Sequence, residues 1–279
     1  MIRDITLGQY YPAESPLHRM DARVKILLTF AYIVMLFLVK GIPTMLLVAF
    51  LVFLLIKMSK VPFKFIFRGL KAIFFIITLT VVLNMFMLPG RTLVEFGIFK
   101  ITYEGLYMAI FVGIRLVLLM FGSSLLTLTT KPLNLTDGIE SILKPLEKIG
   151  VPAHELAMMM SIALRFIPTL LEETDKIMKA QMARGADFES GNIFKRAKAI
   201  IPLLVPLFVS AFRIARELAM AMEARCYRGG ENRTRMNHSV ISKIDYTAII
   251  VFLAVSALIL LQSYVLPLFF SYSIILNLG

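Results

Sequence analysis

Five apolar runs limit what this chain can fold into more than any other feature of the sequence. They cover residues 24–39, 44–56, 72–88, 105–129 and 246–266. A helix that crosses a bilayer needs about 20 mostly apolar residues, and shorter runs reach the interfaces with the help of flanking residues. Inside a bilayer only helices and closed barrels satisfy their own backbone hydrogen bonds. We therefore predict an all-α, polytopic membrane protein with about five transmembrane helices, of which the first two form a tight hairpin.

The composition agrees with a membrane protein. Hydrophobic residues make up 58% of the 279 residues and charged residues 17%, against roughly 25% charged in soluble domains. The residues before the first run carry several charges and no apolar core, so we expect no removable signal peptide. Cys226 is the only cysteine, and His18, His154 and His238 are scattered, so we expect no internal disulfide and no metal site.

The basic residues predict the orientation of the chain. They are concentrated before the first run, in the connection after the second run and in residues 131–245, whereas the turn around Lys40 and the loop 91–100 are poor in them. Lysine and arginine are retained on the cytoplasmic side. We expect a multi-pass protein of the plasma membrane with its amino terminus inside and its carboxyl terminus outside. Lipid headgroups account for the net charge of +12, so no nucleic-acid partner is expected.

The same pattern divides the chain into three segments. Residues 1–130 hold the first four membrane helices, and residues 246–279 hold the last helix and a tail. Residues 131–245 predict a cytoplasmic domain of long amphipathic helices, because their apolar stretches are too short to cross; residues 199–212, for example, would form a helix of about 21 Å. On its surface we expect Lys176 to pair with Glu172, and Arg213 with Glu217.

Two helices of this domain are predicted to end on similar residues. The two endings are Ala183-Arg184-Gly185 and Ala224-Arg225-Cys226. A glycine after an arginine is an ordinary helix stop, because glycine takes a positive φ and the cation favours the carboxyl end of the helix dipole. A repeated ending in one chain suggests a repeated contact with two similar surfaces. We predict that Arg184 and Arg225 are equivalent contact points for two related soluble partners.

Polar groups inside the predicted membrane helices are few. Arg115 lies about 15 Å from the start of its run, near the middle of the bilayer, and Asn84 is the strongly polar residue of the third run. Arg115 could line the bundle interior or dock a second membrane protein, or it could be a structural arginine bonded to neighbouring backbone carbonyls. Ala109 and Gly113 are spaced to let a neighbouring helix approach closely.

The sequence lacks the common motifs for nucleotide binding and for hydrolytic catalysis. No P-loop occurs, since no glycine is followed by lysine, and no Gly-x-Ser-x-Gly or His-Glu-x-x-His is found. A membrane-embedded lipid or isoprenoid transferase would need clustered acids, and the one dense group, Glu172, Glu173 and Asp175, has lysines one turn away. A self-contained secondary transporter would need repeated broken helices with polar groups at the midplane, for which only Arg115 and Asn84 qualify. We expect no catalytic residue, metal ligand or bound cofactor in this chain.

Taken in order, these residues resemble the transmembrane T component of energy-coupling factor (ECF) importers, a family that includes cobalt-transport permeases. The resemblance covers nearly the whole chain. Its motifs are residues 127–132 (Thr-Leu-Thr-Thr-Lys-Pro), residues 164–168 (Leu-Arg-Phe-Ile-Pro) and the two Ala-Arg-x endings. The second ending departs from Ala-Arg-Gly at Cys226.

The resemblance implies a function and a set of partners. The two endings belong to coupling helices, each docking one of two ABC ATPases, with Arg184 and Arg225 as contact residues. ATP and Mg²⁺ bind to those ATPases, and a small substrate-binding S component in the membrane captures the vitamin or other micronutrient. ATP-driven motion then passes through the coupling helices to the S component. The substrate is chosen by that other subunit.

Overall fold

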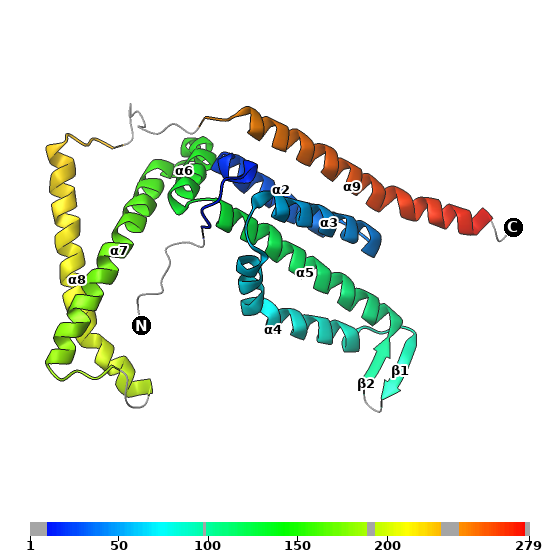
Figure 1. Ribbon diagram of the computed structural model, residues 1–279, viewed down its shortest axis with the longest axis horizontal. Helices are drawn as coiled ribbons and strands as arrows, with labels where there is room; N and C mark the ends of the chain where they lie inside the picture. The colour runs from blue at the N-terminus through cyan, green and yellow to red at the C-terminus, as the bar shows by residue number, and fades with distance from the viewer. Residues whose placement is uncertain (1–9, 97–98, 189–192, 230–239, 277–279) are drawn as a thin grey trace. The chain divides into compact units, whose positions relative to one another are not determined.

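The structure, a computed structural model, describes residues 10–96, 99–188, 193–229 and 240–276 (Figure 1). The chain forms two compact units. We call Gly8–Gly138 with Ser239–Gly279 the bundle unit, and Met1–Leu7 with Ile139–His238 the paired-helix unit. The described elements are α1 (Pro16–Arg19), α2 (Ala22–Leu38), α3 (Ile42–Ser59), α4 (Phe63–Met87), β1 (Thr92–Phe96), β2 (Phe99–Thr102), α5 (Tyr103–Thr129), α6 (Pro132–Leu143), η1 (Lys144–Ile149), α7 (Ala153–Ala183), α8 (Ile193–Ala224) and α9 (Lys243–Leu276).

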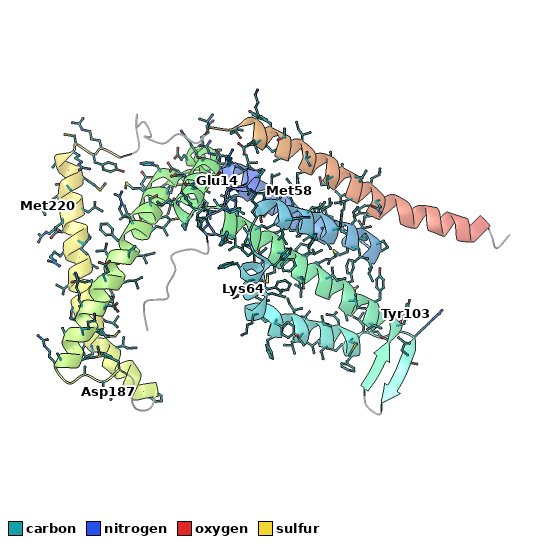
Figure 2. The ribbon with its side chains drawn as sticks, viewed as in Figure 1. Glu14, Met58, Lys64, Tyr103, Asp187 and Met220 are labelled. Carbon is teal, nitrogen blue, oxygen red and sulfur yellow. The ribbon has the colours of Figure 1, made fainter. Side chains whose placement is uncertain are left out.

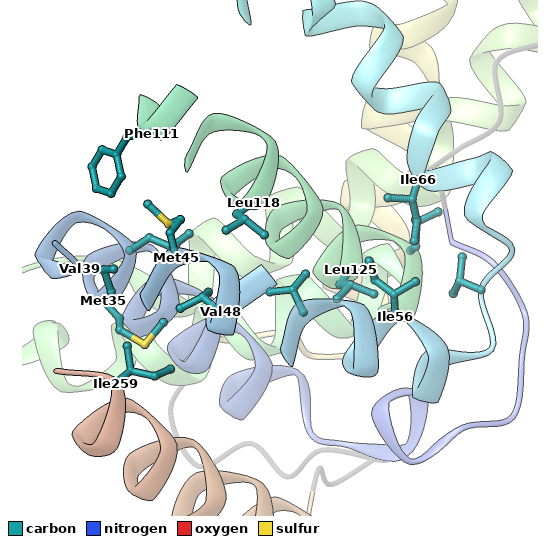
Figure 3. Close-up of a cluster of buried hydrophobic side chains, with 14 residues drawn as sticks. Met35, Val39, Met45, Val48, Ile56, Ile66, Phe111, Leu118, Leu125 and Ile259 are labelled. Carbon is teal, nitrogen blue, oxygen red and sulfur yellow. The ribbon is translucent and has the colours of Figure 1, made fainter. Parts of the chain in front are cut away.

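The core of the bundle unit lies among α2, α3, α5 and α9. Leu36 of α2, Met45 and Ile56 of α3, Leu118 of α5 and Ile259 of α9 are all at most 3% exposed and belong to one apolar cluster (Figure 3). Large apolar side chains also cover the outside of the same helices. Such a surface is far more apolar than water tolerates, and it fits a bundle surrounded by lipid.

The number of membrane helices agrees with the prediction. Four described helices are long and apolar enough to cross a membrane, namely α3, α5, α7 and residues Lys243–Tyr264 of α9. A fifth is α4, if its parts Phe63–Lys71 and Ile73–Met87, which meet at 62°, form one broken span. Every run predicted to span is helical, which confirms the all-α, polytopic membrane fold.

The helices that qualify as membrane-spanning differ from the predicted ones at two places. The first predicted span is α2, which has 17 residues and is too short to count among the four. Conversely, α7 is included although we expected it at the cytoplasmic surface. The 18-residue stretch of α7 that qualifies has a mean hydropathy of 1.2, against 2.2 to 2.4 for those of the other three helices. The division at residues 130/131 and 245/246 stays a prediction about function.

A small hairpin follows α4, where the sequence suggested only a loop. β1 and β2 pair antiparallel, with Thr92 opposite Thr102 and Phe96 opposite Phe99. The signal was present, because two runs rich in β-branched and aromatic residues flank Gly97-Ile98. The base of the hairpin is fixed by the hydroxyl of Thr102, which donates to the carbonyl of Leu88 at 2.8 Å.

In the paired-helix unit, α7 and α8 run antiparallel along most of their length. Gln181 Nε2 donates to the carbonyl of Pro202 at 3.4 Å, Ser210 Oγ to Glu173 Oε1 at 3.3 Å, and the Tyr227 hydroxyl to Met158 Sδ at 3.2 Å. In these three contacts the residue number on α7 falls from 181 to 158 while the number of its partner rises from 202 to 227, which is the pattern of an antiparallel pair. The two carboxyl ends therefore lie at opposite ends of the pair.

Candidate functional site

The carboxyl end of α7 is closed by a Schellman motif. The amide of Gly185 donates to the carbonyl of Met182 at 2.9 Å, and the amide of Ala186 donates to that of Gln181 at 3.0 Å. Gly185 has a φ of 88°, the left-handed backbone that this motif requires. As predicted, the helix ends at Ala183 with Arg184 as its carboxyl cap.

The carboxyl end of α8 repeats the same motif without glycine. The amide of Cys226 donates to the carbonyl of Glu223 at 2.9 Å, and the amide of Tyr227 donates to that of Met222 at 3.1 Å. Cys226 takes a φ of 55°, the left-handed conformation that costs a residue with a β-carbon roughly 1–2 kcal/mol. Cys226 therefore gives the end of α8 the shape that Gly185 gives the end of α7, at the expense of backbone strain.

Both arginines are free to meet a partner. Arg184 and Arg225 are exposed, as are Ala183 and Ala224 beside them. Within the part of the chain that the structure describes, neither guanidinium forms an ion pair. Their role as contact residues stays a prediction.

The distance between the two ends follows from helix geometry. The helices cross where Ser210 of α8 bonds Glu173 of α7. At 1.5 Å per residue, Ala183 lies about 15 Å beyond this crossing on α7, and Ala224 about 21 Å beyond it on α8 in the other direction. The internal prolines lie outside both segments, at Pro168 of α7 and at Pro202 and Pro206 of α8. The two ends are thus about 35 Å apart.

An antiparallel pair of this kind has an approximate twofold axis. A half turn about an axis through the crossing exchanges the two helices, but it superposes their carboxyl ends only roughly, because one end lies about 15 Å and the other about 21 Å from the crossing. The two ends share the same cap hydrogen bonds and the same Ala-Arg sequence. In Figure 2, Asp187 lies just beyond one end and Met220 just before the other.

The crossing is polar, and its ion pairs differ from those expected. Ser210 is 7% exposed, and Nη2 of Arg213 donates to its hydroxyl at 3.4 Å instead of pairing with Glu217. Lys176 lies 3.8 Å from Glu173, three residues away, rather than pairing with Glu172. Glu173 lies toward α8 and is shared between the two helices, which explains the change of partner. Across the described ranges no group of three metal-binding side chains occurs.

The two polar side chains that the sequence singled out inside the bundle unit bond to backbone carbonyls, although Nε of Arg115 is buried without a hydrogen-bond partner. Nη2 of Arg115 donates to the carbonyl of Val39, the cap of α2, at 3.1 Å, and its guanidinium lies 4.5 Å from the centre of the Phe111 ring. This matches the structural reading of Arg115; a role in docking another membrane protein stays a prediction. Asn84 Nδ2 donates to the carbonyl of Thr80 in its own helix at 2.8 Å.

Gly113 lies where α4 and α5 approach closely. A β-carbon at Gly113 would be 3.1 Å from Val81 Cγ2 of α4, and Ala109 is 1% exposed. These contacts agree with the predicted use of small residues in helix packing.

One polar cluster was missed by the sequence analysis. Lys25, which we placed at the edge of the first span, and Asp245, to which we gave no role, are 7% and 0% exposed. A local signal existed for Asp245, since Ser242-x-x-Asp245 before an apolar run is a capping-box pattern. Nothing local indicated that the two residues lie in one cluster.

Comparison with known proteins places these features in a family. Residues 13–236 match the family described as CbiQ, cobalt transport protein. Proteins named energy-coupling factor transporter transmembrane protein EcfT are similar over most of the chain. The one from Thermosediminibacter oceani is 57% identical over 249 residues, which are 89% of this chain and 94% of the relative. Those from Acidaminococcus fermentans and Bacillus subtilis are 54% and 47% identical, covering 96% and 93% of this chain and 100% and 98% of theirs. This multi-pass membrane chain therefore belongs to the family of ECF transporter transmembrane (T) components.

Proposed function

We propose that this chain is the coupling subunit of an ATP-driven ECF importer for vitamins or other micronutrients. It links two ABC ATPases to a substrate-binding S component and transmits ATP-driven motion between them. The observation that carries the proposal is the pair of matching helix ends, each with an exposed arginine, at opposite ends of one antiparallel pair.

Two related ATPases fit these two ends better than one partner does. An ATPase dimer presents two similar surfaces related by a twofold axis, and a single chain can meet both only with two similar contacts. The approximate twofold axis of α7 and α8 supplies that match. Arginine suits the contact because it stays charged and binds carboxylates through two parallel hydrogen bonds.

The chain itself carries no catalytic role in this proposal. The sequence has no P-loop, so ATP and Mg²⁺ are held by the partner ATPases. A membrane-embedded transferase is less well supported, because its acidic candidates lie at the crossing, where Glu173 bonds Ser210 and Lys176. The paired-helix unit and the amino terminus face the cytoplasm, and the carboxyl terminus faces outward, in keeping with the basic residues.

The test is co-purification of the ATPases with variants of the two arginines. If each arginine binds a carboxylate in a groove, Arg184→Glu or Arg225→Glu brings two like charges together and leaves the partner unpaired. Such a loss costs on the order of 2–5 kcal/mol, which weakens binding roughly 30-fold or more. One intact end still holds the ATPases in part, so the double variant loses binding more than additively. A plain helix-capping role costs no more than about 1 kcal/mol.

The matched control is the double variant Lys179→Glu, Arg228→Glu. It makes the same change in net charge on exposed residues near the same two helix ends. We expect it to retain the ATPases. Transport is followed with radiolabelled riboflavin as probe, in vesicles that also hold a riboflavin-binding S component. A correctly inserted Arg184→Glu, Arg225→Glu variant that holds its ATPases and transports normally would refute the proposal.

A further inference from the structure

The cluster that the sequence analysis missed begins with a buried carboxylate between two helix starts. Asp245 is 0% exposed, and its Oδ2 accepts from the amide and the hydroxyl of Ser242 at 2.7 and 2.9 Å. Ser242 precedes the first residue of α9, so these bonds cap α9. The other oxygen, Oδ1, accepts from the amide of Asp21 at 2.9 Å. Asp21 caps α2 through its own side chain, which accepts from the amide of Arg23 at 2.8 Å. One carboxylate thus fixes the starts of α2 and α9 together.

A buried cation joins a third helix end to the same cluster. Lys25 lies in the first turn of α2, and its Nζ donates to the carbonyl of Thr129 at 2.9 Å and to the hydroxyl of Thr130 at 3.3 Å. Thr129 is the last residue of α5. A cation at a carboxyl end and anions at amino ends both oppose the helix dipole, so the charges match the three ends that they hold. We call Asp21, Lys25, Thr129, Thr130, Ser242 and Asp245 the polar knot.

The residues before α2 pack over the knot. The amide of Tyr11 donates to the carbonyl of Leu128 in the last turn of α5 at 2.9 Å, and Nζ of Lys25 is 3.5 Å from the carbonyl of His18. His18 Nε2 donates to the carbonyl of Tyr11 at 3.0 Å, and its Nδ1 accepts from the hydroxyl of Ser15 at 2.7 Å. Burial lowers the pKa of His18, the Lys25 charge adds to this, and the Tyr11 bond opposes it. A neutral ring fits these two hydrogen bonds.

The polar knot lies where the chain leaves and re-enters the bundle unit. The chain passes into the paired-helix unit between Gly138 and Ile139 and returns between His238 and Ser239. Thr129 and Thr130 are the last residues of the polar knot before the crossing at Gly138. Ser242 and Asp245 are its first residues after the crossing at His238. Two of the three covalent connections between the units are therefore close in sequence to one buried group of charges, and the third, between Leu7 and Gly8, lies outside the described residues.

We propose that the polar knot is the anchor through which force from the paired-helix unit reaches the bundle. This inference rests on the proposed coupling function. A pull on the first connection acts on α6, whose Gly138 packs against Ala22 and Ile26 in the first turns of α2, and then on Thr130. A pull on the second acts on Ser242. A loose attachment at these points would be absorbed by fraying of the last turn of α5 or the first turns of α2 and α9. Charged hydrogen bonds inside a water-poor cluster resist that fraying more than exposed ones do. Lys25 and Asp245 are positioning residues for transport.

Two substitutions open the knot with little change in shape. Both oxygens of the Asp245 carboxylate accept from backbone amides. Asp245→Asn replaces one of these oxygens by an NH₂ group, which cannot accept and so faces an N–H donor. Lys25→Met keeps the length of the side chain and removes its donors. The matched control is Ser263→Ala, also in α9. Ser263 is 2% exposed, and its hydroxyl accepts from the amide of Lys40 at 2.7 Å and donates to its carbonyl at 3.1 Å. It joins α9 to the α2–α3 turn, away from both connections.

The experiment uses the whole complex in vesicles and measures ATPase content, ATP hydrolysis and riboflavin uptake. We expect Asp245→Asn and Lys25→Met to hold their ATPases and hydrolyse ATP within about twofold of the unsubstituted complex, while uptake per ATP falls at least about fivefold. Ser263→Ala should keep uptake per ATP within about twofold.

Other outcomes would overturn the inference. Unchanged uptake per ATP in both knot variants would show that the cluster is not the anchor, and the proposed function would stand. An equal fall in Ser263→Ala, or loss of the ATPases from the knot variants, would show general support of the fold instead. An unsubstituted chain that binds no ATPase would refute the proposed function and this inference together.

Discussion

The two helix ends differ in one residue, and replacing Cys226 by glycine tests whether that residue is strained. Cys226 has a φ of 55° and Gly185 a φ of 88° in otherwise equivalent caps. The Cys226→Gly variant keeps the hydrogen bonds of the motif and removes the β-carbon that opposes the left-handed backbone.

The magnitude is a balance of two terms. Relief of the left-handed strain favours the variant by roughly 1–2 kcal/mol. Glycine has more freedom in the unfolded chain, which opposes folding by about 0.4–1 kcal/mol. The net gain for the cap lies between about 0 and 1.6 kcal/mol, and its central value of about 0.8 kcal/mol slows opening of the last turn of α8 roughly fourfold.

The reverse change at the other end should cost more than this gain. At Gly185 an added β-carbon meets no atom within 4 Å, so the cost is purely conformational. A φ of 88° lies farther from the left-handed minimum near 57° than the φ of Cys226 does. We expect Gly185→Cys to speed opening of the last turn of α7 by more than about fivefold.

Hydrogen exchange measured by mass spectrometry reads both effects at once. Peptides that cover residues 219–229 should exchange more slowly in Cys226→Gly, and those that cover residues 178–188 should exchange faster in Gly185→Cys. Peptides from the middle of α7 are the internal control and should not change. Equal exchange in all three proteins would mean that the left-handed residues carry no strain, and the explanation given for the second cap would be wrong.

Two further predictions concern the bundle and its orientation. Arg115→Met removes the donor that caps α2 at Val39, so we expect the free energy of unfolding, measured by heating in detergent, to fall by roughly 1.5–3 kcal/mol. The control Asn84→Leu loses a bond only within its own helix and should stay nearly unchanged. Equal stability of the two variants would contradict the capping role. In a Cys226→Ser background, a cysteine at Leu93 of the β-hairpin should react with an impermeant thiol reagent in intact cells and one at Arg228 should not, and the reverse labelling would invalidate the orientation.

Local patterns predicted the helices and the two helix ends, because both depend on neighbours in the sequence. The apolar runs identified α2, α3, α4, α5 and α9, and the Arg-Gly stop identified the end of α7. The cap at Cys226 could not be predicted with the same force, since cysteine gives no local reason to take a positive φ. Its equivalence with Gly185 became visible only through the repeated hydrogen bonds.

Long-range pairing was beyond the sequence patterns. Lys25 and Thr129 are far apart in the chain, and neither has a local sign of the other. Asp245 showed only its capping of α9, and the bond from Asp21 depends on how α2 and α9 pack. The partner of Arg115 was likewise open, because a carbonyl at the end of another helix leaves no mark in the residues around Arg115.

The pinned α2–α3 turn has a consequence for the lipid around the protein. Arg115 and Ser263 hold Val39 and Lys40 of this turn, and α5 continues about 18 Å beyond Arg115 to Tyr103. The hairpin of 17-residue α2 and 18-residue α3 is therefore shorter than its 27-residue neighbour, and the protein presents two hydrophobic thicknesses to one bilayer. A short span is accommodated by thinning of the bilayer or by snorkelling of flanking side chains, and a long one by tilting, each at a cost of fractions of a kcal/mol per ångström of mismatch. A change of acyl-chain length should therefore relieve the mismatch beside the hairpin and increase it beside α5, or the reverse.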